Sequence, residues 1–163
     1  MSDERTLRAK PRLRTATAAD VPALAALYRD AARACGPSAY TPAQVAAWAS
    51  MADEPRFRAF VLGPETVVLE DDTGLVGFAG WRPDGHVASL YVRPDRMRQG
   101  HGQRLLAEVI ARARRARLHR LHTEASAFSR PVFERAGFVL VGTEVVERGG
   151  VTFQRPCLAL DLA

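Results

Sequence analysis

Apolar residues follow two different periods along this chain, and together they divide most of it into predicted strands and helices. Apolar or β-branched residues at every second position predict half-buried strands, and short apolar runs bounded by glycine or proline indicate buried ones. Apolar residues that recur every three or four positions predict a helix with one buried face. Strands are expected at residues 13–17, 66–70, 75–81, 87–92, 118–125, 139–146 and 151–162.

Two predicted helices near the N-terminus begin with capping signals. Thr17 is followed three residues later by Asp20, which is typical of a threonine cap, and Gly36–Pro37 is expected to end this helix. Thr41 with Gln44 at the reciprocal position predicts the start of a second helix. Further helices are expected to begin near Gly102 and near Phe128.

Tight turns join the middle strands. Residues 71–74 and 83–85 are rich in aspartate, glycine and proline, so the three strands between residues 66 and 92 are expected to be antiparallel neighbours. Residues 52–58 are polar and contain a proline, and a loop is expected there. Residues 148–150 separate the last two strands, which are expected to form a hairpin.

The stretch from Arg93 to Leu106 combines a strand end, a glycine turn and the start of a helix. The first N–H groups of such a helix have no main-chain partners, and the helix dipole favours negative charge at the same point, so a phosphate fits there. Gly100 and Gly102 allow close approach of a ligand and a positive φ. A turn that needs glycine only for its geometry is the alternative interpretation. The predicted helix buries a stripe formed by Leu105, Leu106, Val109, Ile110 and Ala113.

This stretch resembles the acyl-CoA-binding signature of the GNAT N-acetyltransferases. The resemblance rests on Val92-x-Pro94, on residues 98–102 (Arg-Gln-Gly-His-Gly) and on Leu105-Leu106, and it departs at Met97, where the family usually has Gln or Arg. It implies acetyl-CoA as acyl donor, with the pyrophosphate on the turn amides and the pantetheine arm on the preceding strand, and it implies no metal. The cofactor-binding residues that it implies are Leu90, Tyr91, Val92, Arg98, Gln99, Gly100, His101, Gly102, Gln103, Ser126 and Phe133.

Residues 132–138 resemble a second GNAT element, a short helix followed by glycine and phenylalanine. Many family members have a tyrosine there as general acid, but this chain has Phe133, which cannot donate a proton. With both elements the resemblance covers nearly all of residues 13–162. It implies a single α/β domain of the GNAT type, with a mixed, mostly antiparallel sheet of about six to seven strands flanked by about four helices.

Three polar residues are candidates for the chemistry of acetyl transfer. His86 occupies the position where GNAT members with an identified base often have Glu or His, although a histidine that only follows a turn is an equal alternative. Glu124, near the end of the next parallel strand, could bind or deprotonate an amine, or could be a solvated strand residue. Ser126 could bind the pantetheine arm, relay a proton or cap the following helix. Main-chain N–H on the cofactor strand, foremost that of Leu90, would meet the oxyanion, as the family implies.

Length and composition agree with one folded domain. The 163 residues include 47% hydrophobic and 25% charged residues, and we expect a flexible tail at residues 1–9 and a domain at residues 10–163. The sequence contains no apolar run long enough to span a bilayer and begins with a charged segment, so we expect a cytoplasmic protein. Cys35 and Cys157 have no metal-ligand spacing and are expected to be reduced. The arginine and alanine bias indicates a GC-rich bacterial genome.

The net charge of +5 comes almost wholly from arginine, and the densest cluster lies late in the helix after the glycine turn. Cations at a helix C-terminus are favoured by the dipole, and the sequence has no nucleic-acid-binding motif. The expected partners are therefore acetyl-CoA and an amine acceptor, with neither nucleic acid nor membrane. Dimers are common in such folds, but the sequence carries no marker for one. The predicted function is direct N-acetylation of a small-molecule or peptide amine; the alternative is a non-catalytic acyl-CoA-binding or sensor protein.

Overall fold

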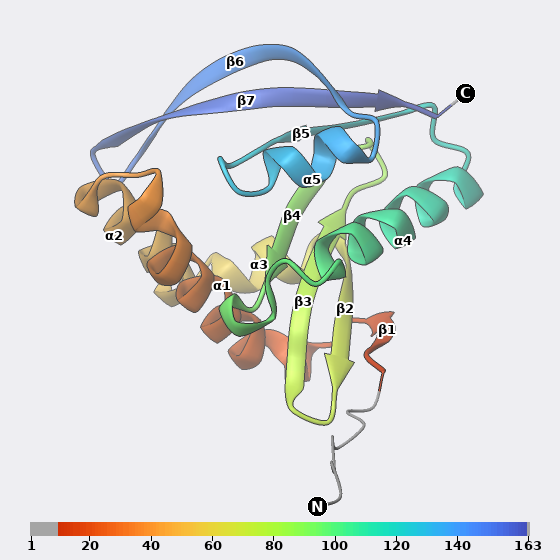
Figure 1. The fold of residues 1–163 in the computed structure, drawn as a ribbon, viewed down its shortest axis with the longest axis horizontal. Coiled ribbons are helices and arrows are strands. Elements are labelled where there is room, and N and C mark those ends of the chain that lie inside the picture. The colour runs from red at the N-terminus through yellow and green to blue at the C-terminus, as the bar shows by residue number, and fades with distance from the viewer. Residues whose placement is uncertain (1–9, 163) are drawn as a thin grey trace, which may run out of the picture.

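The computed structural model of the chain describes residues 10–162, so the predicted tail at residues 1–9 lies outside the described residues. Figure 1 shows the arrangement of its helices and strands. The strands are β1 (Arg12–Thr15), β2 (Glu65–Asp71), β3 (Gly74–Trp81), β4 (Val87–Val92), β5 (Arg120–Glu124), β6 (Val139–Arg148) and β7 (Val151–Asp161). The α-helices are α1 (Val21–Cys35), α2 (Pro42–Ser50), α3 (Phe57–Leu62), α4 (His101–Arg115) and α5 (Arg130–Arg135).

The strands form two antiparallel sheets, one of four strands in the order β1-β2-β3-β4 and one of three in the order β5-β7-β6. They meet where β4 lies beside β5, through a single parallel bridge between His86 and His122. Helix α4 connects these two strands, as a crossover between parallel neighbours requires. The fold class is therefore confirmed as a single α/β domain in which antiparallel pairing dominates.

Beyond this bridge β4 and β5 diverge. The main-chain N–H of His122 donates to Gly85 O (3.0 Å) and the Thr123 hydroxyl donates to Val87 O (2.9 Å). The sheet ladder between the strands does not continue past these contacts in the described structure, and a cavity of about 50 Å³ lined by both strands and α5 opens there. The fold thus leaves part of the edge of β4 unpaired, with a gap beside it.

Two apolar clusters cover the two faces of the four-stranded sheet. The stripe of α4 packs on one face, and helices α1 and α3 pack on the other (Figure 1). Because side chains alternate along a strand, β2 directs Val67 and Leu69 into the first cluster and Val68 into the second. All five residues of the predicted α4 stripe are buried, each large aliphatic one worth about 1.5–3 kcal/mol on burial.

The predicted helix starts are present, but the predicted loop at residues 52–58 is wrong in part. Thr41 and Gln44 form the expected reciprocal cap of α2. A short 3-10 turn occupies Met51–Asp53, and α3 already begins at Phe57. Phe57 and Val61 lie one helical turn apart and are both buried against α1, so tertiary packing decides the conformation of a segment whose polar residues suggested a loop.

Strand β6 lies at the edge of the three-stranded sheet and exposes large apolar side chains. Val139 and Val145 are 62% and 64% exposed, and Leu140 and Val141 are also exposed. The apolar pattern of the sequence did not separate this strand from the buried ones. None of the described helices is both long enough and apolar enough to cross a membrane.

Candidate active site

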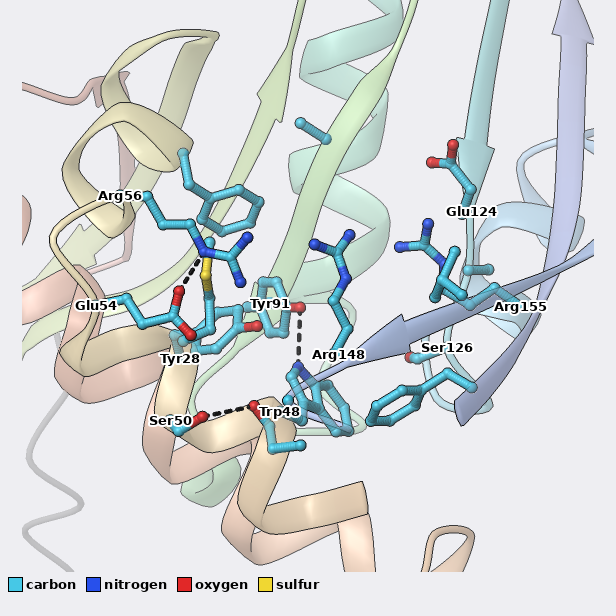
Figure 2. Close-up of a pocket in the computed structure, with 18 of the residues that line it drawn as sticks. Tyr28, Trp48, Ser50, Glu54, Arg56, Tyr91, Glu124, Ser126, Arg148 and Arg155 are labelled. Atoms are coloured by element: carbon cyan, nitrogen blue, oxygen red, sulfur yellow. Dashed lines mark hydrogen bonds and ion pairs between the residues drawn. The ribbon is translucent and has the colours of Figure 1, made fainter. Parts of the chain in front are cut away.

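A cleft of about 370 Å³ opens beside the point where the two sheets part. Its walls come from α1, α2, the segment before α3, the strands β4 and β5, and the β6–β7 hairpin (Figure 2). Glu124 and Ser126 line both this cleft and the smaller gap between β4 and β5. The cleft and the gap are therefore adjacent, and a molecule in one can reach a molecule in the other.

The glycine turn forms an anion-binding geometry at the start of α4. Arg98 has φ 60° and Gly100 has φ 84°, and left-handed residues of this kind turn successive N–H groups toward one side. Within the described structure, the main-chain N–H groups of residues 98–103 donate to no main-chain acceptor; the first helical bond of α4 is from Arg104 N to Gly100 O. A Cβ on Gly100 would meet open space, so this glycine is required for its φ and not for packing. The residues present fit a pyrophosphate.

Side chains hold this turn from behind. Arg96 is buried and pairs at 2.7 Å with Asp71, the last residue of β2, and its Nε donates to Gln99. Asp71 stays ionised because hydrogen bonds from Thr73 and then from Arg96 hold its pKa well below the usual range. Arg104 donates to Pro11 O. Arg96 and Arg104 therefore bond to other parts of the fold, and Arg98 is the exposed cation of the turn.

Three other predicted residues of the turn have distinct environments. Gln103 donates from its amide to Val132 O in α5. His101 is half-buried with a depressed pKa, owing first to burial and then to Arg96 and Arg104, and its Nε2 has no partner among the described residues. Met97, where the sequence departs from the family, contacts Cys35 at the end of α1 with its sulfur. The departure thus places an apolar contact behind the turn and leaves the amides unchanged.

Alternate residues of β4 direct their main-chain groups toward the gap. Arg93 N donates to Val76 O in β3 (2.7 Å), and N–H directions alternate along a regular strand, so Tyr91 also pairs toward β3. The main-chain groups of Leu90 and Val92 then point away from β3, toward the unpaired edge. A register shift next to Trp81 separates this part of β4 from the part that contacts β5. The residues expected to meet pantetheine therefore offer free main-chain groups.

The two candidate bases, His86 and Glu124, contact each other. His86 Nε2 lies 2.6 Å from Glu124 Oε2, and both side chains are about one quarter exposed at the cleft. The hydrogen bond from His86 is the main cause that lowers the pKa of Glu124, against the opposing effect of burial. The His122 ring stacks on His86 with centroids 5.3 Å apart. The sequence treated His86 and Glu124 as separate candidates, and only the tertiary fold shows that they form one pair.

Ser126 and Phe133 complete the predicted set on the far side of the gap. The Ser126 hydroxyl accepts hydrogen bonds from the N–H groups of Phe128 and Ser129, as a helix cap does, and donates to the Ser129 hydroxyl. Phe133 is buried and packs edge-on against Phe138 while lining the gap. Ser126 therefore caps the turn that precedes α5, whose own N-cap residue is Ser129, and its predicted role in catalysis remains a prediction.

Aromatic side chains form much of the cleft surface. The Trp48 indole N–H donates to the Tyr91 hydroxyl (3.3 Å), shown as a dashed line in Figure 2, and Trp48 also packs against Tyr40. The Tyr40 hydroxyl accepts from Ala127 N (3.0 Å), which ties the cleft to the segment after β5. Burial raises the pKa of Tyr91, so its hydroxyl stays protonated.

Four arginines that were not candidates from the sequence also line the cleft. They come from positions scattered along the chain, and no local pattern brings them together. Their shared property, a place in the lining of one cleft, exists only in the folded protein. They are Arg56, Arg82, Arg148 and Arg155.

Comparisons with known proteins bear on this arrangement. The profile of the acetyltransferase (GNAT) domain matches residues 37–155, which include the turn and every lining residue of the cleft except Tyr28. The chain belongs to the GNAT acetyltransferase family. This GNAT chain is also 30% identical over 134 residues to the uncharacterized N-acetyltransferase YafP of Escherichia coli K12, covering 82% of this chain and 85% of YafP.

Solved structures show the same GNAT fold. A GCN5-related N-acetyltransferase from Rhodopseudomonas palustris superposes with a TM-score of 0.88 at 26% identity, covering 95% of this chain and 98% of that one. The PaiA N-acetyltransferase of Thermoplasma acidophilum, solved in complex with coenzyme A, gives a TM-score of 0.77 at 13% identity over 93% and 98% of the two chains. YncA of Salmonella typhimurium, solved with acetyl-CoA, gives 0.65 at 21% identity over 94% of each chain. At these last two identities the likeness concerns the fold.

Proposed function

We propose that this GNAT domain transfers the acetyl group of acetyl-CoA directly to the amine of a small molecule or peptide. The observation that carries the proposal is the 2.6 Å contact between His86 Nε2 and Glu124 Oε2 at the junction of the cleft and the gap. A paired imidazole and carboxylate at such a junction can take a proton from an amine that approaches a thioester in the gap. Neither residue alone supports the proposal as strongly.

Acetyl-CoA is proposed to bind along the turn and the edge of β4. Its pyrophosphate accepts hydrogen bonds from N–H groups among residues 98–103, which have no main-chain acceptors in the described chain. Its pantetheine arm pairs with the outward main-chain groups of Val92 and Leu90. The N–H of Leu90 then lies on the edge that meets the thioester carbonyl, and it stabilises negative charge on that oxygen. The complexes of PaiA with coenzyme A and of YncA with acetyl-CoA support a ligand of this kind in the fold.

The proposed chemistry needs one base and one leaving group. Glu124, ionised beside His86, favours the tautomer with hydrogen on Nε2, so Nδ1 is the basic nitrogen that accepts the proton from the amine. The neutral amine attacks the carbonyl carbon, a C–N bond forms, the C–S bond breaks, and the nitrogen releases its extra proton to water. Coenzyme A leaves as a thiolate and takes a proton from water, because Phe133 has none to give and the Ser126 hydroxyl already donates to Ser129. Cys35 and Cys157 do not line the cleft, which favours direct transfer over an acyl-enzyme route.

The substitution of the family's tyrosine by Phe133 favours one alternative, a sensor that binds acyl-CoA without turnover. Two measurements separate the functions. Thermal unfolding with acetyl-CoA, with coenzyme A and with neither should show a raised midpoint for both ligands, because binding to the native state stabilises it by mass action, about 2.7 kcal/mol at one hundred times Kd. Thiol release from acetyl-CoA with a panel of amines should then follow.

The outcomes are distinct. A raised midpoint with amine-dependent thiol release supports the transferase. A raised midpoint without thiol release for any amine supports the sensor and refutes the transferase. An unchanged midpoint at millimolar acetyl-CoA refutes both.

A further inference from the structure

The cleft beside the His86–Glu124 pair contains more positive than negative side chains. Its lining includes four arginines, at positions 56, 82, 148 and 155, and two glutamates, Glu54 and Glu124. Charged groups in a partly enclosed cleft are costly unless they are paired, so the partner of each group matters.

Pairing within the protein accounts for only part of this charge. Arg56 pairs with Glu54, shown as a dashed line in Figure 2, and Glu124 pairs with His86. Arg155 pairs with Glu144, but its Nε is buried without a partner among the described residues. Among residues 10–162, the guanidinium groups of Arg82 and Arg148 have no hydrogen-bond or ion-pair partner. Two cations of the cleft are thus left for a ligand.

Arg148 places its guanidinium group inside the cleft. It extends from the end of β6 into the space between the aromatic wall and β5, with its guanidinium near the middle of the view in Figure 2. Burial is the main cause that raises the pKa of the Tyr28 hydroxyl. The positive charge of Arg148 acts on the same hydroxyl and opposes part of this increase. Arg82 enters from the end of β3, where its main-chain N–H donates to His86 O. Its Nη1 lies beside Gly63 after α3, 3.9 Å from the position that a Cβ on Gly63 would take. Of the two unpaired cations, Arg148 is therefore the one whose guanidinium lies inside the cleft.

We propose that the acceptor is a small molecule that carries a carboxylate as well as its amine, with the carboxylate held by Arg148 and the amine at His86 and Glu124. This inference rests on the proposed function. Guanidinium groups bind carboxylates through paired, charge-assisted hydrogen bonds. The aromatic wall of Tyr40 and Trp48 offers apolar surface to the rest of the molecule. A cleft of about 370 Å³ suits one small molecule and is at the lower end of ligand pockets.

The test compares molecules that differ only in the carboxylate. L-Phenylalanine, L-leucine and L-methionine are each assayed beside their amides and the corresponding decarboxylated amines, with thiol release from acetyl-CoA as the readout. A charge-assisted hydrogen bond is worth about 1.5–3 kcal/mol, so kcat/KM for at least one acid should exceed that of its neutral counterparts about 10- to 100-fold. Neutral amines that react as well as the acids would overturn the inference and leave the transferase proposal standing.

Two variants assign the preference to the cleft. Arg148→Gln should lower kcat/KM for the acid about 10- to 100-fold more than kcat/KM for the amide. Arg114→Gln, the loss of an exposed arginine on α4, removes the same net charge and should change neither value. If Arg148→Gln lowers the acid and the amide equally, the role of Arg148 is structural and the inference fails.

A binding measurement keeps the inference independent of turnover. The acids should change the fluorescence of Trp48, which lines the cleft, in the presence of coenzyme A, and Trp48→Phe identifies this signal against that of buried Trp81. Binding that requires Arg148 without acetylation of any amine would uphold the carboxylate site and refute the transferase. Absence of both binding and acetylation of the acids would overturn the inference whatever the neutral amines do.

Discussion

The glycine turn and the neighbouring cleft of this GNAT domain, the proposed cofactor and acceptor sites, differ in what they are made of. The turn uses main-chain N–H groups of six consecutive residues, 98–103, in a conformation set by two left-handed residues. The cleft uses side chains that range from Tyr28 to Arg155 and come from both sheets and several helices. A site made of consecutive main-chain groups tolerates many side-chain changes, whereas a site made of distant side chains depends on each of them. The following substitutions test this difference.

The largest effect is expected at the His86–Glu124 pair. His86→Gln removes the basic nitrogen and should lower kcat about 100- to 1000-fold, because a positioned base contributes that order of rate acceleration. The acetyl-CoA dissociation constant from calorimetry should stay unchanged, because the turn makes no use of this ring. His119→Gln changes an exposed histidine and serves as the control. A loss of kcat below threefold in His86→Gln would remove the pair from the mechanism.

Glu124→Gln tests the same pair through its pH dependence. The pKa of Glu124 is lowered in the folded protein, chiefly by the hydrogen bond from His86. A carboxylate with a lowered pKa in the folded protein contributes stability at pH values above its unfolded pKa, which is near 4.5. This contribution is lost as the pH falls through the folded pKa. Wild type should therefore exceed Glu124→Gln in unfolding free energy at pH 6 to 7, and the difference should shrink as the pH falls below 4.5 and through the folded pKa of Glu124. Parallel stability curves over this range would contradict the pairing.

Arg96→Met tests whether the turn also depends on side chains that support it. Arg96→Met leaves the Asp71 carboxylate, which is fully buried, without its cationic partner, and breaking a buried pair in this way costs about 3 kcal/mol. Denaturant unfolding should show this loss, and acetyl-CoA affinity should fall with it because Arg96 supports the turn from behind. Arg98→Met, at an exposed cation of the same turn, should stay within about 0.5 kcal/mol of wild type. Equal stability of the two variants would show that the buried pair is dispensable.

The difference between the two regions also explains what the sequence could predict. The turn follows from local rules: glycine permits a positive φ, a helix start leaves N–H groups free, and the apolar stripe of α4 sets the helix axis. Strand β4 was predicted at its observed bounds, Val87–Val92, for the same reason. Consecutive residues carry all of this information, so the motif at residues 98–102 is visible without a fold.

The cleft could not be predicted in this way. His86 and Glu124 are 38 positions apart, and their contact depends on β4 and β5 meeting at one bridge. Arg148 carries no local signal, because a charged residue before two glycines is ordinary in a hairpin turn. Helix α3 was missed because its two buried residues find their partners in α1. In each case the deciding contact is between residues distant in sequence, which periodicity and spacing do not report.

A substitution of Gly100 tests the left-handed glycine of the turn directly. Gly100→Val places a β-branched residue at φ 84°, a conformation that costs about 1–3 kcal/mol, and relief of this strain turns the N–H groups away from the phosphate. The dissociation constant of acetyl-CoA should rise about 10- to 100-fold in calorimetry. Gly150→Val introduces comparable strain at φ 76° in the β6–β7 turn and should leave this constant unchanged. Equal affinities for the two variants would mean that the turn amides do not hold the cofactor.

The smallest effect is expected at the cap of α2, and it should appear only on the acceptor side. The Thr41 hydroxyl accepts from Gln44 N, and the Gln44 side chain both accepts from Thr41 N and donates to Thr152 O in β7. Thr41→Ala removes one half of this cap and should cost about 1 kcal/mol of unfolding free energy. Because α2 carries Trp48 into the cleft, KM for the acceptor should rise while the acetyl-CoA dissociation constant stays constant. Ser38→Ala, at an exposed hydroxyl outside the cap, is the control. If the cofactor constant changed as much as the acceptor KM, the two regions would be coupled through α2, and the separation between a main-chain site and a side-chain site would fail.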